Sequence, residues 1–249
     1  MNEAEMAEYA RTVRVPVYAV GPDDRLKFGS VLRLVQETSE QHLGVMGAGY
    51  EEMRRRTNLV FFIISTRVRL GRLPLHGERV VIKTHPRGRA GAQFYRDFLF
   101  YGEGGEPLVS VMQTTVLVEA GTRRIQRPQA LREFGIRPGA VVPPQERMER
   151  LEAPQGLPPA GERRVFRSDL DANGHMNNCV YGDIVSDFLP AELRPAVRGV
   201  QIHYLSETPE GDVLRIFAGN RDGAFLMRGE NARGVSFAAR VRTGKKRAE

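Results

Sequence analysis

Residues 168–181 read SDLDANGHMNNCVY, and no other part of the 249-residue chain gathers polar side chains so densely. Asp171, Asn173 and His175 alternate with other residues, so an extended backbone would place all three on one face. From Val180 to Phe188 the apolar residues recur at helical spacing, and Pro190 ends the run. The stretch therefore predicts a polar cluster at the entrance of a short helix.

The entrance of a helix can itself support chemistry. Backbone N–H groups of the first turn have no partners within the helix, and they can stabilise a carbonyl oxygen that gains negative charge. We expect Asn177 or Asn178 to cap this helix and both to lie where a substrate binds. Judged by residue types alone, the segment could equally be an ordinary turn without a functional role. Asp, Asn and Gly are common turn residues, and a single His is often structural.

Composition describes an ordinary globular chain, with 41% hydrophobic and 27% charged residues. No apolar run approaches the roughly eighteen residues that a membrane span requires. Residues 1–10 are acidic and lack the charged-then-apolar order of a signal peptide. We expect a cytoplasmic protein without a membrane span.

Cysteine and histidine usage argues against a metal site. The single cysteine, Cys179, excludes an internal disulfide and a multi-cysteine zinc site. It is either a nucleophilic thiol beside the polar cluster or a small buried residue, and its place in the expected first helical turn favours burial. The histidines outside the cluster show no metal-ligand spacing, and no glycine loop has the pattern that cradles a phosphate. We therefore expect no metal and no cofactor.

The formal net charge of +7 favours an acidic partner. The basic residues are scattered except for the runs 54–56 and 245–247, and no nucleic-acid-binding motif surrounds either run. We expect no nucleic-acid partner. An acidic carrier protein and the phosphates of coenzyme A fit the charge equally well.

The chain repeats one order of elements. In the first half an expected helix from Phe28 to Leu43 is followed by four expected strands, and a helix after Asn178 is followed by four more. The expected strands are 59–70, 79–84, 93–101 and 108–119, then 198–206, 213–219, 224–229 and 235–242, with leading strands at 12–20 and 163–167. Gly77-Glu78 matches Gly211-Asp212 in position, and Pro74 matches Pro209. The pattern predicts two copies of one α+β module.

A proline-rich segment separates the two copies. Seven of the fifteen prolines lie between residues 126 and 160, where they prevent regular strand pairing and favour a semi-rigid connection. We predict an N-terminal domain of residues 1–135, a linker of residues 136–160 and a C-terminal domain of residues 161–249.

The polar run D-x-N-x-H-x-N-N, which starts at Asp171 and is followed by Tyr181, resembles the signature of acyl-acyl-carrier-protein thioesterases. The resemblance covers roughly residues 13–128 and 163–243, and it includes several features of the family's first domain. They are Gln36-Glu37, Pro74 with Gly77-Glu78, Arg96-Asp97-Phe98 and Thr122-Arg123-Arg124. The resemblance implies two tandem hotdog domains, each an antiparallel sheet wrapped around a long central helix. The family commonly has tryptophans in its first domain, and this chain has none, which leaves the acyl-chain preference open.

The resemblance also implies a catalytic set of Asp171, Asn173, His175 and Glu207. In that set Glu207 is the preferred general base for water, and Asp171 either holds its neighbours in place or shares the base role. Asn173 and His175 would orient the water or polarise the thioester.

The first half lacks such a set, because its helix entrance at residues 23–28 has no His or Asn pair. We expect it to be non-catalytic and to form the acyl pocket between helix and sheet. The candidate lining residues, which could equally be plain core, are Phe28, Val31, Leu32, Val35, Phe61, Phe62 and Ile64.

The expected function is hydrolysis of fatty acyl-acyl-carrier-protein to free fatty acid and carrier by attack of water on the thioester. The expected partner is a carrier protein that bears a phosphopantetheine-linked acyl chain, and a homodimer is compatible with the sequence. Two alternatives stay open: an acyl-coenzyme-A thioesterase with the same site, and a non-catalytic hotdog protein that binds an acyl ligand.

Overall fold

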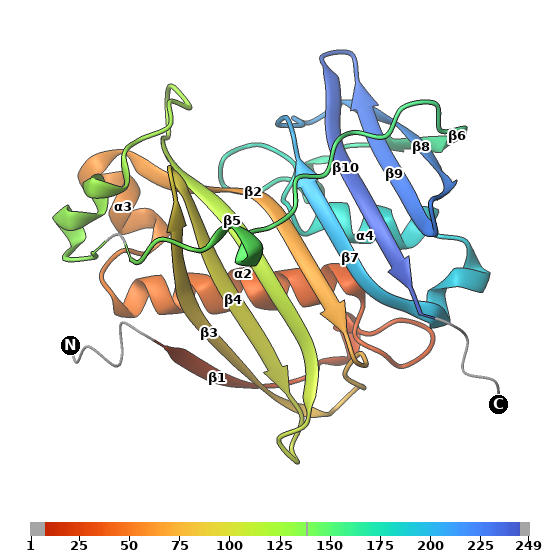
Figure 1. Cartoon of the computed structure of the whole chain (residues 1–249), viewed down its shortest axis with the longest axis horizontal. Helices are drawn as coiled ribbons and strands as arrows, with labels where there is room; N and C mark the ends of the chain where they lie inside the picture. The colour runs from red at the N-terminus through yellow and green to blue at the C-terminus, as the bar shows by residue number, and fades with distance from the viewer. Residues whose placement is uncertain (1–7, 138, 245–249) are drawn as a thin grey trace.

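The computed structural model describes residues 8–137 and 139–244, and the basic run 245–247 lies outside these ranges. Ten strands form one sheet in the order β1-β3-β4-β5-β2-β7-β10-β9-β8-β6, and every neighbouring pair is antiparallel. Helices α2 and α4 lie on the same face of this sheet (Figure 1). The predicted α+β class, with a mostly antiparallel sheet and few helices, is confirmed.

The two halves of the chain contribute five strands each. The first half contains β1 (Tyr9–Arg14), η1 (Val17–Ala19), α2 (Phe28–Val45), α3 (Tyr50–Thr57), β2 (Leu59–Leu70), β3 (Arg79–Ala90), β4 (Gln93–Tyr101) and β5 (Pro107–Glu119). After η2 (Pro128–Phe134) and η3 (Pro144–Glu146) come β6 (Pro159–Arg164), η4 (Arg167–Asp169), α4 (Val180–Phe188), η5 (Ala191–Ala196), β7 (Val197–Tyr204), β8 (Val213–Arg221), β9 (Ala224–Asn231) and β10 (Gly234–Thr243). The halves meet where β2 pairs with β7.

Three strand predictions were wrong by three or more residues at an end. The first leading strand was expected to reach Val20, but β1 ends at Arg14 and a 3₁₀ turn follows Pro16, which has no N–H for a sheet. The second leading strand was expected at residues 163–167, but β6 spans Pro159–Arg164 and a 3₁₀ turn begins at Arg167. Strand β3 was expected to end at Thr84, yet it continues through Pro86 to Ala90. Because β1 pairs with β3 only as far as Thr84, the extension is an edge strand, where proline is tolerated.

Helix α3 was not predicted. It has no apolar stripe, and Met53 is its one buried residue. Glu51 and Glu52 occupy its first turn and three arginines its last, an arrangement that complements the helix dipole. This charge pattern was the signal in the sequence for a helix at these residues.

The proline-rich segment crosses the face of the sheet opposite to the helices (Figure 1). It is attached to the sheet by hydrogen bonds, for example from Gln201 to the Glu149 carbonyl at 2.6 Å and from Ala218 N–H to the Pro158 carbonyl at 3.1 Å. Leu151 and Leu157 of the segment are themselves buried. In the first half the Arg89 N–H on β3 donates to the Ala140 carbonyl of the segment at 2.9 Å. The segment therefore packs on both halves of the sheet.

The main core fills the space between the helices and the sheet, and it includes Phe98, Phe100, Ile184 and Phe237. Within the described ranges, no helix is long and apolar enough to cross a membrane.

Helices α2 and α4 approach each other at two glycines. A Cβ atom on Gly182 would lie 3.1 Å from the Gly29 Cα and 2.9 Å from a methyl group of Leu32. An ion pair between Arg33 and Asp183, with Nη2 and Oδ2 2.7 Å apart, crosses the same contact. The close approach thus requires glycine at these positions.

We expect Gly182→Ala to lower the free energy of unfolding by about 1–3 kcal/mol, because the added methyl group overpacks the helix contact. Gly44→Ala is the matched control, since Gly44 also lies in a helix and a Cβ there meets nothing within 4 Å. That variant should be as stable as the parent or up to about 1 kcal/mol more stable. Urea unfolding measures both, and a Gly182→Ala protein at least as stable as the parent would show that the helices are not in close contact.

Candidate active site

The loop at residues 171–175 is a tight turn. The Asp171 N–H donates to the His175 carbonyl at 2.9 Å, and the Gly174 N–H donates to the Asp171 carbonyl at 3.0 Å. Gly174 has a φ of 78°, in the left-handed region that favours glycine. The expectation that Asp171, Asn173 and His175 share one face of an extended run is therefore wrong.

The Asp171 carboxylate points back into this turn. Its Oδ1 atom accepts the backbone N–H of Asn173 at 2.8 Å and that of His175 at 3.5 Å. A side-chain oxygen that binds backbone two residues ahead is a common way to hold a turn. Asp171 thus fixes the backbone of its two neighbours.

His175 and Glu207 meet across two segments of the second half. The His175 Nε2 lies 3.0 Å from Glu207 Oε2, within ion-pair distance. The Met176 N–H donates to the Thr208 carbonyl at 2.8 Å, and His175 forms a bridge with Pro209, so backbone contacts hold the loop against the segment after β7. The side chains are 21% and 38% exposed, so a ligand can reach the pair.

The first half contributes Arg123 to this pair. Its Nε lies 2.9 Å from Glu207 Oε1, and its guanidinium lies over the Phe62 ring, 5.0 Å from the centroid. Arg123 follows β5 and has a φ of 60°, so a turn carries it toward the second half. In the sequence it stood out only as part of a family-like motif, without a role.

Tyr50 and Arg54, both on α3, approach Asn173. The Tyr50 hydroxyl donates to Asn173 Oδ1 at 2.7 Å, and Arg54 Nη1 donates to the Tyr50 hydroxyl at 3.0 Å. Neither residue was predicted to belong to the site, because α3 was not predicted and nothing in the sequence pairs that helix with Asn173.

Asn177 and Asn178 do not cap α4 as expected. The helix begins at Val180, and Cys179 occupies the cap position without a side-chain bond. Asn177 instead stabilises the preceding turn, where its Oδ1 accepts the Cys179 N–H at 2.9 Å. The Asn178 backbone carbonyl accepts the Tyr204 hydroxyl at 3.3 Å. The cap lies later because the chain makes one more turn before it enters the helix.

Cys179 is buried, and its Sγ donates to Gln36 Oε1 at 3.1 Å. Burial raises the pKa of the thiol to about 12, so the thiolate is scarce at neutral pH. These features match a packing residue.

The first half contains the same turn with different side chains. The Gly21 N–H donates to the Arg25 carbonyl at 2.8 Å, and the Asp24 N–H donates to the Gly21 carbonyl at 3.0 Å. By this match Gly21, Asp23 and Arg25 stand where the second half has the Asp, Asn and His of its motif.

The contact that follows the turn identifies the counterpart of Glu207. The Leu26 N–H donates to the Pro74 carbonyl at 2.8 Å, as that of Met176 does to Thr208. Pro74 therefore corresponds to Thr208, which corrects the match with Pro209, and Leu73 takes the place of Glu207.

Strand β2 extends beyond its partner in the second half. It pairs with β7 only over Ser65–Arg69, while it pairs with β5 along its whole length. In the unpaired part Phe62 and Ile64 are half-buried and, like Tyr50, pack against a buried cluster of Val60, Val116 and Val118. Four of the other first-half candidates for an acyl pocket, Phe28, Val31, Leu32 and Val35, lie in the main core. The last, Phe61, is partly buried against a separate cluster that includes Met53 and Leu117.

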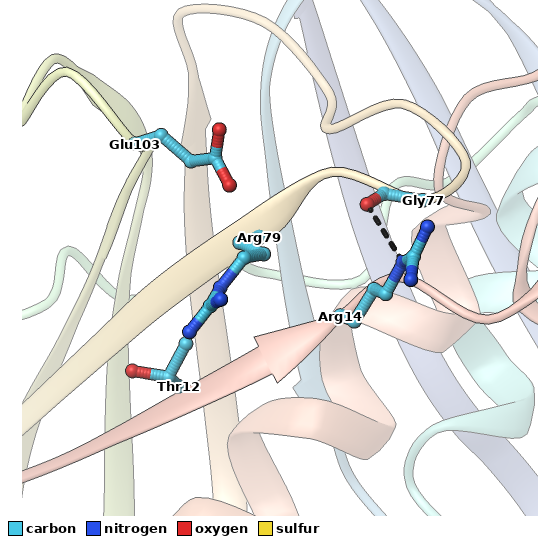
Figure 2. Close-up of a pocket in the computed structure, with 5 residues that line it drawn as sticks. All are labelled: Thr12, Arg14, Gly77, Arg79 and Glu103. Atoms are coloured by element: carbon cyan, nitrogen blue, oxygen red, sulfur yellow. Dashed lines mark hydrogen bonds between the residues drawn. The ribbon is translucent and has the colours of Figure 1, made fainter.

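An open depression lies at another edge of the molecule, where β1 meets β3 (Figure 2). Its lining residues are Thr12, Arg14, Gly77, Arg79 and Glu103, and Arg14 Nε donates to the Gly77 carbonyl at 3.2 Å. None of them belongs to the cluster around His175. Among the described residues no group of three His, Cys, Asp or Glu side chains could hold a metal ion.

Comparison with known families agrees with the motif. The N-terminal domain model of acyl-ACP thioesterases matches residues 6–130, and the C-terminal domain model matches residues 160–248. Together the two matches span most of the chain. The chain belongs to the acyl-ACP thioesterase family.

Individual relatives include the chloroplastic dodecanoyl-[acyl-carrier-protein] hydrolase of Cinnamomum camphora, which is 26% identical over 224 residues. The hydrolase of the same name from Umbellularia californica is 27% identical over 222 residues. Each alignment covers 83% of this chain, and the chain spans 58% of the length of each relative.

Two solved structures have the same fold. An acyl-ACP thioesterase from Bacteroides thetaiotaomicron superposes with a TM-score of 0.83 at 18% identity, over 98% of this chain and 100% of the other. The 12:0-ACP thioesterase from Umbellularia californica has a TM-score of 0.79 at 22% identity, over 94% of this chain and 96% of the other.

We expect Cys179→Ala to keep the activity of the parent within about threefold, because a thiol with a pKa of about 12 supplies little nucleophile. Iodoacetamide should leave the folded parent unmodified at neutral pH and label it after denaturation, as mass spectrometry can show. Loss of activity in a folded Cys179→Ala protein would show that the thiol takes part in the reaction.

Proposed function

We propose that the chain hydrolyses fatty acyl groups from an acyl carrier protein and releases the free fatty acid and the carrier. The observation that carries the proposal is the contact between His175 and Glu207 beside Asn173, in the half that matches the C-terminal domain of the family. The relatives named above are hydrolases of acyl-carrier-protein thioesters.

The reaction adds water to the thioester and breaks the C–S bond. The water oxygen attacks the carbonyl carbon while one water proton passes to Glu207, which acts as general base. When the tetrahedral intermediate collapses, the sulfur leaves and takes up that proton, so the products are a carboxylic acid and a thiol. N–H groups near the carbonyl oxygen stabilise its transient negative charge.

Glu207 has acceptor capacity for this water. Its Oε1 is buried, and no hydrogen bond from a described residue reaches it, although Arg123 contacts it as an ion pair. A carboxylate offers about four acceptor positions, of which His175 faces one oxygen. The acceptor positions that Arg123 and His175 leave open on this carboxylate can bind the attacking water.

The remaining members of the set have supporting roles in this proposal. Asp171 holds the turn, because its Oδ1 is engaged with backbone N–H groups. His175 orients Glu207 and the water, and Asn173 contacts the thioester carbonyl. Asn177 and Asn178 line the approach to α4 and contact the substrate arm.

The domain organisation belongs to the same proposal. We assign tandem hotdog domains at residues 1–135 and 161–249, joined by the linker 136–160. The repeated turn and the sheet order, which reads the same outward from β2 and from β7, support this division. The first domain is non-catalytic and supplies acyl-binding surface.

An acidic carrier is the proposed partner. The chain carries a net charge of +7, and Arg124 and Arg127, one and four residues after Arg123, are exposed. A basic rim of this kind attracts an acidic protein and guides its pantetheine arm. A cytoplasmic location and a homodimer stay predictions.

We expect His175→Ala and Glu207→Gln each to lower kcat by about 10²–10⁴-fold, the range typical of acid–base groups. Glu210→Gln is the matched control, since Glu210 is an exposed carboxylate near Glu207 and should leave kcat unchanged. Circular dichroism checks that the variants fold. If both site variants stay within about threefold of the parent, the assignment is wrong.

Parallel assays with acyl-carrier-protein and acyl-coenzyme-A substrates, over a range of chain lengths, test the carrier. We expect higher kcat/KM for the carrier substrate, and a steep loss of that advantage near 1 M salt, where the Debye length is about 3 Å. Higher kcat/KM for the acyl-coenzyme-A substrates would show that coenzyme A, and not a carrier protein, bears the acyl group. Acyl binding without hydrolysis of either substrate would indicate a binding protein.

A further inference from the structure

The role proposed for Asn173 depends on which end of its carboxamide faces the substrate. The oxygen can only accept hydrogen bonds, whereas the NH₂ group can donate two. Only the NH₂ end can stabilise a carbonyl oxygen that becomes negative. The hydrogen-bond network around the side chain decides its orientation.

Helix α3 takes part in this hydrogen-bond network through the Tyr50 hydroxyl. A tyrosine hydroxyl has one proton to donate, and an arginine can only donate. Arg54 Nη1 lies 3.0 Å from the Tyr50 oxygen, so it occupies an acceptor position there. The Tyr50 proton is then free to reach Asn173 Oδ1, 2.7 Å away. In the flipped orientation the Asn173 NH₂ would be a second donor to the same oxygen, and the Tyr50 proton would lose this acceptor.

Tyr50 is itself held firmly. Its backbone N–H donates to Glu40 Oε1 on α2 at 2.8 Å, and Met53 anchors α3 in a buried cluster. Arg54 follows one helical turn later and stays within reach of the ring. The hydroxyl is thus delivered by a helix that is fixed to the first half.

Asn173 is consequently fixed at two points. Asp171 holds its backbone N–H at 2.8 Å, and Tyr50 holds its side-chain oxygen. The Nδ2 end is left to face the reacting group.

We propose that Tyr50 is a positioning residue, which together with Arg54 turns the Asn173 NH₂ toward the thioester carbonyl. This inference rests on the proposed function, because the carbonyl is the substrate's. It gives the non-catalytic half a direct part in the chemistry of the other half.

The test is a double-mutant cycle of Tyr50→Phe and Asn173→Ala in the full chain. Loss of an oxyanion donor typically costs about 10²–10³-fold in kcat, so we expect Asn173→Ala to lie in that range. Tyr50→Phe, which loosens the donor without removing it, should lower kcat by about tenfold and change KM by less than about twofold. In the Asn173→Ala background Tyr50→Phe should add less than about twofold, because residues that act together are not additive.

Tyr9→Phe is the matched control, since the Tyr9 hydroxyl also bonds a carboxamide oxygen, that of Gln41, at 3.1 Å. It should leave kcat unchanged. An unchanged kcat in Tyr50→Phe, or a full additional loss in the Asn173→Ala background, would overturn the inference.

A second measurement separates this inference from the proposed function. The side-chain NH₂ signals of Asn173 in a ¹⁵N spectrum can be identified by their loss in Asn173→Asp. We expect them to shift in Tyr50→Phe and not in Tyr9→Phe. A parent protein that hydrolyses no thioester would refute the proposed function, whereas unshifted signals in Tyr50→Phe would refute the inference alone.

Discussion

The pairing of β2 with β7 over Ser65–Arg69 is the contact on which the rest of the molecule depends, because it joins two five-stranded halves into one sheet. The pairing stops at Ser65 and His203, and beyond them each strand stays paired only with its neighbour in its own half, β2 with β5 and β7 with β10. Chain segments from both halves converge beyond that point. Arg123 reaches Glu207, and Tyr50 reaches Asn173.

The helix side of the molecule supports the same junction. Gly29 and Gly182 allow α2 and α4 to lie close together, and the ion pair of Arg33 with Asp183 crosses between them. On the other face the proline-rich segment is bonded to strands of both halves. The halves are therefore held together on both faces of the sheet as well as within it.

Much of the fold follows from local patterns in the sequence. Strands β2 and β4 begin and end at the predicted residues, because alternating or continuous apolar runs are bounded by clear turn residues. Helix α2 was predicted from its apolar spacing. The order of elements in the two halves was also visible, and only the match of Pro74 was displaced by one residue.

The candidate site was less accessible to sequence reasoning. The motif from Asp171 to His175 marked the loop, but its alternation suggested an extended face where the chain makes a turn. The hydrogen bonds from the Asp171 side chain to the backbone stabilise a turn at these residues. The alternating spacing of polar residues does not reveal these bonds. The roles of Tyr50 and Arg123 depend on contacts between residues far apart in the chain, which one sequence does not contain.

The repeated turn has a consequence for how such a chain can change over time. In the first half the turn keeps its backbone bonds, although Gly21, Asp23 and Arg25 carry none of the motif's chemistry. The first half does not need the motif's side chains, but it must keep its contacts with the second half. Its α3 and the turn after β5 contact polar side chains there. If one half were exchanged for that of a distant relative, the residues of the other half that contact it would also have to change. The two halves are therefore expected to evolve together.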